Sequence, residues 1–246
     1  KMLAQIEGIA PNYHAIHPMT ANAPEECVAL FMNVLRTLQF DIQYRAPSYV
    51  KWLLAQEAKI AYGDYLNQLK MIQYYRPSGE RFLLKDPTHV CHLDTVLGCF
   101  PNAKIIFIHR DPVHSFSSIG SLYAYTRAIF SDSVDAKAIG QELLAGHWPK
   151  AIDKMMAIRA ELPPSQFIDL RQKDLARDPI STVARAYQHW DFELGDAAIG
   201  QMELFLKKRE INFPGVHEHS LQNLSVAESD INHRFGHYIE QFDLQA

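Results

Sequence analysis

The sequence predicts an α/β protein in which a small parallel sheet is wrapped by helices and preceded by additional N-terminal helices. Short apolar runs alternate with stretches whose apolar residues recur at helical spacing. The run Lys104–His109 is almost unbroken in apolar character, which is typical of a strand buried on both faces of a parallel sheet. Strands that alternate with helices favour right-handed crossovers and therefore parallel pairing.

The first third of the chain predicts helices. Asn22 and Pro24, followed by two glutamates, form a helix-start signal, and apolar residues continue at helical spacing to Leu38. A second helix is expected from Pro47. A third is expected over residues 60–75, before the turn cluster at residues 76–79.

The rest of the chain predicts strands and helices in alternation. Three strands are expected, at Arg81–Lys85, Lys104–His109 and Gln166–Leu170. Helices are expected over residues 89–99, 113–130, 136–160, 179–190, 196–208 and 226–242. Ser225 and Glu228 have the spacing of a capping box for the last helix. Because no repeat, low-complexity tract or linker interrupts the chain, we expect one domain over residues 1–246.

Composition restricts the partners. The net charge of −4 and the pI near 6.3 argue against nucleic acid or an acidic membrane surface, so any anion site must be local. No run of about 18 apolar residues predicts a membrane span. The three cysteines are odd in number and lack a C-x-x-C pair, which favours packed thiols in a cytoplasmic protein. No grouping of His, Cys and acidic residues has metal-ligand spacing, so no metal is expected.

One segment predicts an anion site. The apolar run ends at Arg110, Asp111-Pro112 predicts a turn, and a helix follows at once. Ligands of open parallel sheets bind beyond the carboxyl ends of strands, and free N–H groups at a helix start favour anions. A guanidinium and the Ser118 hydroxyl, about two helical turns on, suit a phosphate monoester. In the alternative interpretation Arg110 pairs with Asp111 or another acid and Ser118 is an ordinary polar surface residue.

The segment P-x-A-K-I-I-x-x-x-R-D-P at residues 101–112, followed by Ser118, resembles the 3′-phosphate-binding segment of sulfotransferases that use 3′-phosphoadenosine 5′-phosphosulfate (PAPS). In that family the residues matching Arg110 and Ser118 hold the 3′-phosphate of the donor. The resemblance covers nearly the whole chain in order and is to a bacterial branch of the superfamily. It rests on residues 15–19, 24–27, 47–52, 84–89, 174–175, 178–179 and 235–242.

This resemblance implies a fold of the P-loop/sulfotransferase type and transfer of a sulfonate group from PAPS to a hydroxyl or amine. The acceptor would be a small molecule, a lipid or a carbohydrate, and the product nucleotide would be adenosine 3′,5′-bisphosphate. No metal is needed, and a homodimer is an expected assembly.

The chain departs from the family pattern in three places. It contains no R-S-G-T-T loop for the 5′-phosphosulfate, and we expect an upstream strand, loop and helix to precede Lys1. Gln172 stands where many relatives have an aromatic residue near the adenine. The basic glycine-rich loop of the vertebrate cytosolic branch is replaced by residues 207–209 and 217–220, which assigns His219 to the donor site. The basic residues 207–209 could equally be a solvated helix end.

Sulfonate transfer needs a base for the acceptor hydroxyl and a cation near the leaving group. Lys85, at the end of a predicted strand, is expected to be that cation and to contact the donor. His89 is expected to be the base, since its unperturbed pKa near 6.5 suits neutral pH. In the family a histidine close to this lysine is the usual base, although Pro87 lies nearer the usual position. His17 and the pair Glu25–Glu26 are alternative bases.

Two further histidines and the aromatic residues of the predicted N-terminal helices are interpreted as structural or as acceptor-binding residues. His92 and His109 are expected to be packing or supporting residues. Aromatic residues of the front helices suggest an apolar acceptor pocket, or else ordinary helix packing: Tyr13, Tyr44, Tyr49, Trp52, Tyr62, Tyr65, Tyr74 and Tyr75.

Two other functions remain open. A P-loop kinase or phosphotransferase would use the same kind of sheet, but the motif G-x-x-x-x-G-K-[ST] is not found. The second alternative function is that of a non-catalytic binding protein related to sulfotransferases.

Overall fold

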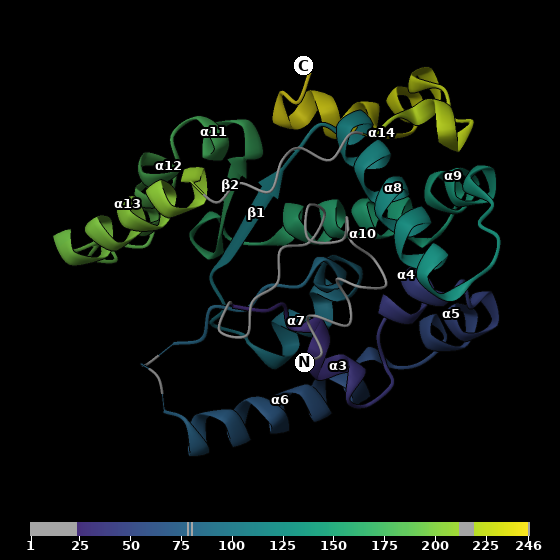
Figure 1. The fold of residues 1–246 in the computed structure, drawn as a ribbon. Coiled ribbons are helices and arrows are strands. Elements are labelled where there is room, and N and C mark those ends of the chain that lie inside the picture. Colours follow the sequence, from purple (N-terminus) through teal and green to yellow (C-terminus); the bar gives the residue numbers. More distant parts are fainter. Residues whose placement is uncertain (1–23, 78, 80, 212–218, 246) are drawn as a thin grey trace. The chain divides into compact units, whose positions relative to one another are not determined.

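The computed structural model describes residues 24–77, 79, 81–211 and 219–245 (Figure 1). The described chain forms two compact units. Residues 104–121, 161–211 and 219–245 form what we call the sheet unit, and residues 24–77, 79, 81–103 and 122–160 form the helical unit. Helix α8 (Pro112–Phe130) begins in the sheet unit and ends in the helical unit. A single domain over residues 1–246 stays a prediction.

The sheet unit contains two parallel strands, which confirms the predicted class of fold. Strands β1 (Ile105–His109) and β2 (Phe167–Arg171) pair in register from Ile105 with Phe167 to His109 with Arg171. Figure 1 shows them side by side. The helices of this unit besides the start of α8 are α11 (Gln172–Arg177), α12 (Pro179–His189), α13 (Asp196–Ile211) and α14 (Glu228–Phe242), with short 3₁₀ turns at Pro164–Gln166 and Leu221–Leu224.

Two predictions about strands are wrong. Arg81–Lys85 is not a strand, and Leu83 is 93% exposed. A strand needs a neighbour for its backbone N–H and C=O groups, and no described residue forms a ladder with this segment. The apolar run of β1 is also not buried on both faces, since Ile108 is 53% exposed. Within the described chain β1 pairs with β2 alone.

A buried histidine joins β1, β2 and α14. His109 Nδ1 lies 2.8 Å from the Tyr238 hydroxyl, and Nε2 lies 2.8 Å from Asp169 Oδ1. The Phe242 ring stacks on the imidazole with 3.6 Å between centroids. Both ring nitrogens are therefore satisfied, which confirms His109 as a packing residue.

The start of α14 differs from the predicted capping box. Ala227 is the N-cap residue, and its N–H donates to Asp230 Oδ2 at 3.3 Å. Ser225 has a left-handed backbone with φ of 51° and ends the preceding turn. The helix begins two residues later than the spacing of Ser225 and Glu228 predicts, so these two side chains do not cap it.

The helical unit is built from short helices around α6 (Ala58–Tyr75). The others are α3 (Val28–Met32), α4 (Gln39–Tyr44), α5 (Pro47–Leu54), the 3₁₀ helix η1 (Pro87–His92), α7 (Leu93–Cys99), the end of α8, α9 (Ala136–Ala145) and α10 (His147–Glu161). Pro47 is the first residue of α5, as predicted.

Two predicted helices of this unit are interrupted. The first ends at Met32 because Leu35 turns the chain with φ of 54°. The stretch over 136–160 breaks at Gly146, where an added Cβ would lie 2.2 Å from the Glu142 carbonyl oxygen. Neither break is visible in apolar spacing, because both depend on backbone geometry.

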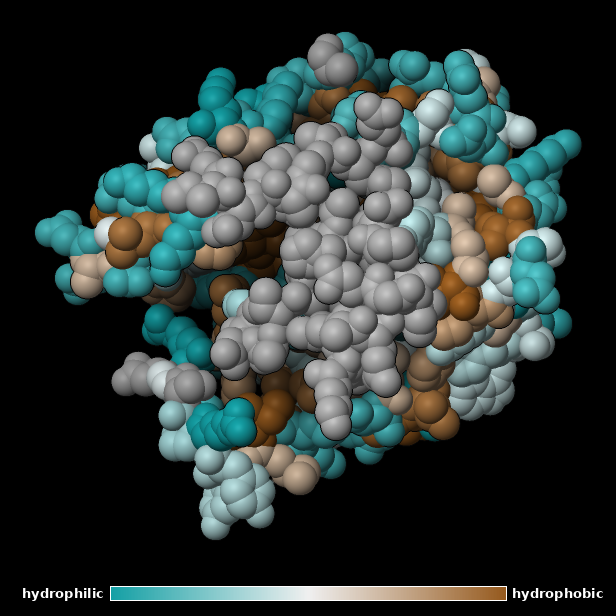
Figure 2. All heavy atoms as spheres, in the orientation of Figure 1, coloured by the Kyte–Doolittle hydropathy of each residue, from teal (hydrophilic) through white to brown (hydrophobic). Residues whose placement is uncertain are grey.

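An aromatic cluster forms the core beside α6. Phe31 stacks on Tyr65 with 4.7 Å between centroids and meets Tyr62 edge-on at 5.2 Å. Tyr62 and Tyr65 are thus buried packing residues, whereas Tyr74 and Tyr75 at the end of α6 are exposed. Figure 2 shows hydrophobic side chains at the surface among hydrophilic ones. No helix in the described ranges is both long enough and apolar enough to cross a bilayer.

Candidate functional site

Lys85 and Glu26 meet in the helical unit. The Lys85 ammonium forms an ion pair with Glu26 Oε1. The Lys85 carbonyl accepts a hydrogen bond of 2.9 Å from the Cys27 N–H, which fixes the two segments side by side. The sequence offered Lys85 as the cation and Glu26 as an alternative base. Their contact places the Glu26 carboxylate beside the Lys85 ammonium.

His89 is placed by the 3₁₀ helix η1. Asp86 caps this helix, since its Oδ1 accepts from the Thr88 N–H at 2.7 Å and from the Thr88 hydroxyl at 2.6 Å. Pro87 occupies the first turn, where its missing N–H costs nothing. The His89 ring therefore turns toward α6, and its Nδ1 lies 2.7 Å from the Tyr62 hydroxyl.

Burial sets the protonation of this pair. Removal from water lowers the pKa of His89, while the nearby Asp86 carboxylate raises it in part. Burial likewise raises the pKa of Tyr62 far above its usual range. At neutral pH the imidazole is thus uncharged and able to accept a proton, and the phenol keeps its own. Asp86 Oδ2 is buried and makes no hydrogen bond within the described part of the chain.

Sequence reasoning missed the roles of Tyr62 and Asp86. Tyr62 was one of many aromatic residues, and nothing local links it to a histidine 27 positions later. The signal for Asp86 was present, since Asp-Pro-Thr is a good start for a helical turn.

Arg110 follows β1 directly, at the carboxyl end of the strand. Asp111 does not pair with it. Its Oδ1 instead accepts from the Val113 N–H at 3.0 Å and caps the start of α8. No carboxylate in the described part of the chain lies within ion-pair distance of Arg110, although the residue is half-buried. The pairing suggested by the alternative interpretation is therefore not found.

Ser118 lies on α8, and its neighbour Ser117 contacts His219. The Ser117 hydroxyl is 2.9 Å from His219 Nδ1 and also bonds to the carbonyls of Val113 and His114. The His114 and His219 rings meet edge-on at 5.2 Å. The structure thus brings His219 beside Ser117 in the first turns of α8. Ser118 is half-buried and makes no side-chain hydrogen bond within the described ranges.

The predicted site residues fall in both units. Lys85 and His89 belong to the helical unit, whereas Arg110, Ser118 and His219 belong to the sheet unit. His17, the remaining alternative base, lies outside the described residues. Over the residues that are described, no cluster of His, Cys, Asp or Glu could hold a metal ion.

The profile of the Sulfotransferase family matches residues 2–196. The chain is 30% identical over 131 residues to omega-hydroxy-beta-dihydromenaquinone-9 sulfotransferase Stf3 of Mycobacterium bovis, and equally to that of Mycobacterium tuberculosis. This alignment covers 50% of the chain and 31% of the relative.

Two solved structures are also similar. Sulfotransferase STF1 of M. tuberculosis aligns with a TM-score of 0.75 and 26% identity, over 95% of this chain and 62% of that one. Sulfotransferase STF9 of Mycobacterium avium shares the fold, with a TM-score of 0.79 and 19% identity, over 99% of this chain and 64% of that one. The chain thus spans less than two thirds of the proteins it resembles. With a family profile that matches most of its length, the chain belongs to the sulfotransferase family.

Proposed function

We propose that this protein transfers a sulfonate group from PAPS to a hydroxyl or amine of a small-molecule, lipid or carbohydrate acceptor. The observation that carries the donor assignment is the half-buried guanidinium of Arg110, which has no carboxylate partner within the described ranges. A cation partly withdrawn from water is costly unless an anion compensates it. A 3′-phosphate would supply that anion.

In this proposal Arg110, Ser118 and His219 bind the nucleotide. The Arg110 guanidinium can bind two phosphate oxygens in a bidentate manner, and the Ser118 hydroxyl can donate to a third. His219 contacts the donor from beside Ser117, which holds its Nδ1.

In this proposal His89 and Lys85 carry out the chemistry. His89 takes the proton of the acceptor hydroxyl as the acceptor oxygen bonds to sulfur and the bond from sulfur to the nucleotide oxygen breaks. The departing adenosine 3′,5′-bisphosphate carries away the electron pair of that bond, and Lys85 neutralises the developing charge. Glu26 holds the Lys85 side chain in place.

The name of the mycobacterial relative describes an ω-hydroxy quinone acceptor, and a lipid-like alcohol is accordingly one acceptor class we propose. We extend the proposal to a cytoplasmic location and a homodimer. The three cysteines are free thiols, which fits a reducing compartment.

Differential scanning fluorimetry on the whole protein tests the donor assignment. Adenosine 3′,5′-bisphosphate should raise the melting temperature more than AMP or ATP with Mg²⁺, and Arg110→Ala should abolish its advantage over AMP. Greater stabilisation by ATP with Mg²⁺ would favour a kinase. Nucleotide binding without sulfonate transfer to any tested alcohol, lipid or sugar would favour a non-catalytic binding protein.

A further inference from the structure

A small cavity lies beside His89 in the helical unit. Its enclosed volume is about 30 Å³, room for one or two water molecules. Tyr62 and His92 line it, and the Tyr62 hydroxyl is the one that contacts His89. The exposed Glu57 also lines it, so the cavity reaches the surface.

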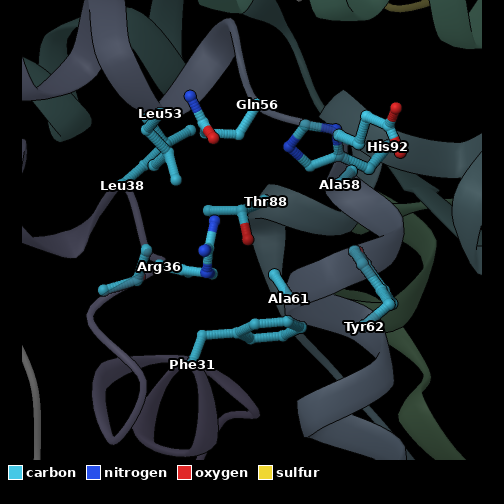
Figure 3. A pocket seen from close by; sticks show the side chains of 12 residues that line it. Phe31, Arg36, Leu38, Leu53, Gln56, Ala58, Ala61, Tyr62, Thr88 and His92 are labelled. Carbon is cyan, nitrogen blue, oxygen red and sulfur yellow. The ribbon is translucent and has the colours of Figure 1, made fainter.

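Arg36 brings a positive charge into this cavity. Figure 3 shows its guanidinium pointing inward toward Thr88. Within the described ranges no carboxylate lies at ion-pair distance from Arg36, and its guanidinium carbon lies 5.5 Å from the centre of the Trp52 ring. Glu57 pairs with Lys59 instead, at 2.6 Å. Among the described lining residues Arg36 is the one with a permanent positive charge.

The backbone holds Arg36 in this position. Leu35 has a left-handed φ of 54°, which is costly for a bulky side chain, and the Arg36 N–H donates to the Phe31 carbonyl at 3.1 Å. The Tyr49 hydroxyl lies 3.0 Å from the Leu35 carbonyl, the Thr37 carbonyl and the Thr37 N–H. One tyrosine therefore pins the chain on both sides of Arg36. Strain that the fold maintains in this way is characteristic of functional sites.

The other polar groups of the cavity complete a site for an anion. The buried Thr37 hydroxyl oxygen accepts from the Gln39 N–H at 3.1 Å, so its proton remains available. The Gln56 amide donates one proton to the Trp52 carbonyl and keeps a second. Burial lowers the pKa of His92, which leaves this imidazole uncharged at neutral pH.

We propose that the cavity around Arg36 binds an anionic group, a carboxylate or a phosphate, of the sulfonate acceptor. A planar guanidinium matches both groups in bidentate geometry. The cavity reaches the surface, so one or two oxygens of such a group would replace its water while the rest of the ligand extends outward. The identification of this ligand as the acceptor rests on the proposed function, whereas the anion site stands on its own geometry.

Binding of benzoate and its neutral isostere benzamide tests the site without reference to sulfonate transfer. We expect benzoate to bind the wild type at least tenfold more tightly than benzamide by calorimetric titration. Arg36→Met should weaken benzoate at least tenfold and leave benzamide unchanged. Arg76→Met is the matched control, since Arg76 is exposed at the end of α6 and does not line the cavity. It should change benzoate affinity less than twofold.

Two further measurements keep the test decisive if Arg36→Met fails to fold. Arg36→Lys keeps the positive charge but lacks the planar guanidinium, and it should weaken the binding of benzoate several-fold. In the wild type, the Arg36 Nε–H resonance should shift on adding benzoate. Equal binding of benzoate and benzamide, an unmoved Arg36 resonance, or an equal loss in Arg76→Met would each overturn the anion site. If the protein binds benzoate at Arg36 but transfers no sulfonate, the anion site is supported and the proposed function is contradicted.

Discussion

Replacing Tyr62 by Phe removes one hydroxyl, the one that lies 2.7 Å from His89 Nδ1. If His89 is the base, its imidazole becomes charged as the acceptor loses its proton. A hydrogen bond to a neutral partner contributes about 1 kcal/mol, and one to a charged partner about 1.5–3 kcal/mol. The bond therefore strengthens by about 1–2 kcal/mol in the transition state. Its loss should lower kcat by roughly 5- to 30-fold.

The pH profile gives a second readout. Protonated His89 cannot act as a base, so kcat/KM rises with pH through the pKa of His89, which burial places below 6.5. Since the Tyr62 oxygen can accept a hydrogen bond from the charged imidazole, Tyr62→Phe should lower this pKa further. The acid limb of the profile should then move to lower pH.

Tyr65→Phe is the matched control for this prediction. Tyr65 lies one turn further along α6, is fully buried in the same cluster, and donates to Cys27 Sγ at 3.1 Å instead of contacting His89 through its hydroxyl. Both variants should lose about 0.5–1.5 kcal/mol of stability. Only Tyr62→Phe should alter kcat and the acid limb. Equal kinetic effects in the two variants, or none in either, would refute the assignment of His89 as a base positioned by Tyr62.

Three other predictions follow from the same unit. His89→Ala should lower kcat by roughly 10²–10⁴-fold with donor affinity nearly unchanged, whereas Lys85→Ala should reduce both, as steady-state kinetics and nucleotide titration will show. A His89→Ala enzyme with ordinary turnover would remove it from the mechanism. Arg127 is 3% exposed and pairs with Glu142 at 2.9 Å, while Glu142 is a third exposed and also pairs with Arg45. Arg127→Met should therefore cost about 1–3 kcal/mol in urea denaturation, and an unchanged stability would contradict this. Burial, with a smaller effect of His92, lowers the pKa of His147 to about 4, so the unfolded chain binds its proton more readily than the folded one. The contribution of His147 to the free energy of unfolding is fully present above pH 6.5 and declines as the pH falls toward 4. His147→Leu should therefore narrow the gap in melting temperature between pH 7.5 and pH 5.0, and an unchanged gap would be evidence against it.

The sequence by itself determined the features that depend only on residues close together along the chain, such as where helices begin and end. Pro47 starts a helix because its fixed φ suits a first turn, and this holds wherever the helix packs. Apolar spacing predicted α6 and α8 to within two residues, because an amphipathic stretch of that length has few other ways to bury its apolar side. The order of strand, Arg110, turn and helix was likewise readable, since a turn after a strand sets the next residues at its carboxyl end.

Tertiary structure alone decided the contacts between distant segments. The pairs Tyr62 and His89, Glu26 and Lys85, and Ser117 and His219 are separated by 27, 59 and 102 positions, and no local preference specifies them. The expected strand at Arg81–Lys85 failed for the same reason, because a strand exists only with a partner. Leu35 adopts a left-handed backbone that its own side chain disfavours, and the Tyr49 hydroxyl that holds its carbonyl comes from a different helix. Local sequence thus determined which elements form, and packing determined which side chains meet.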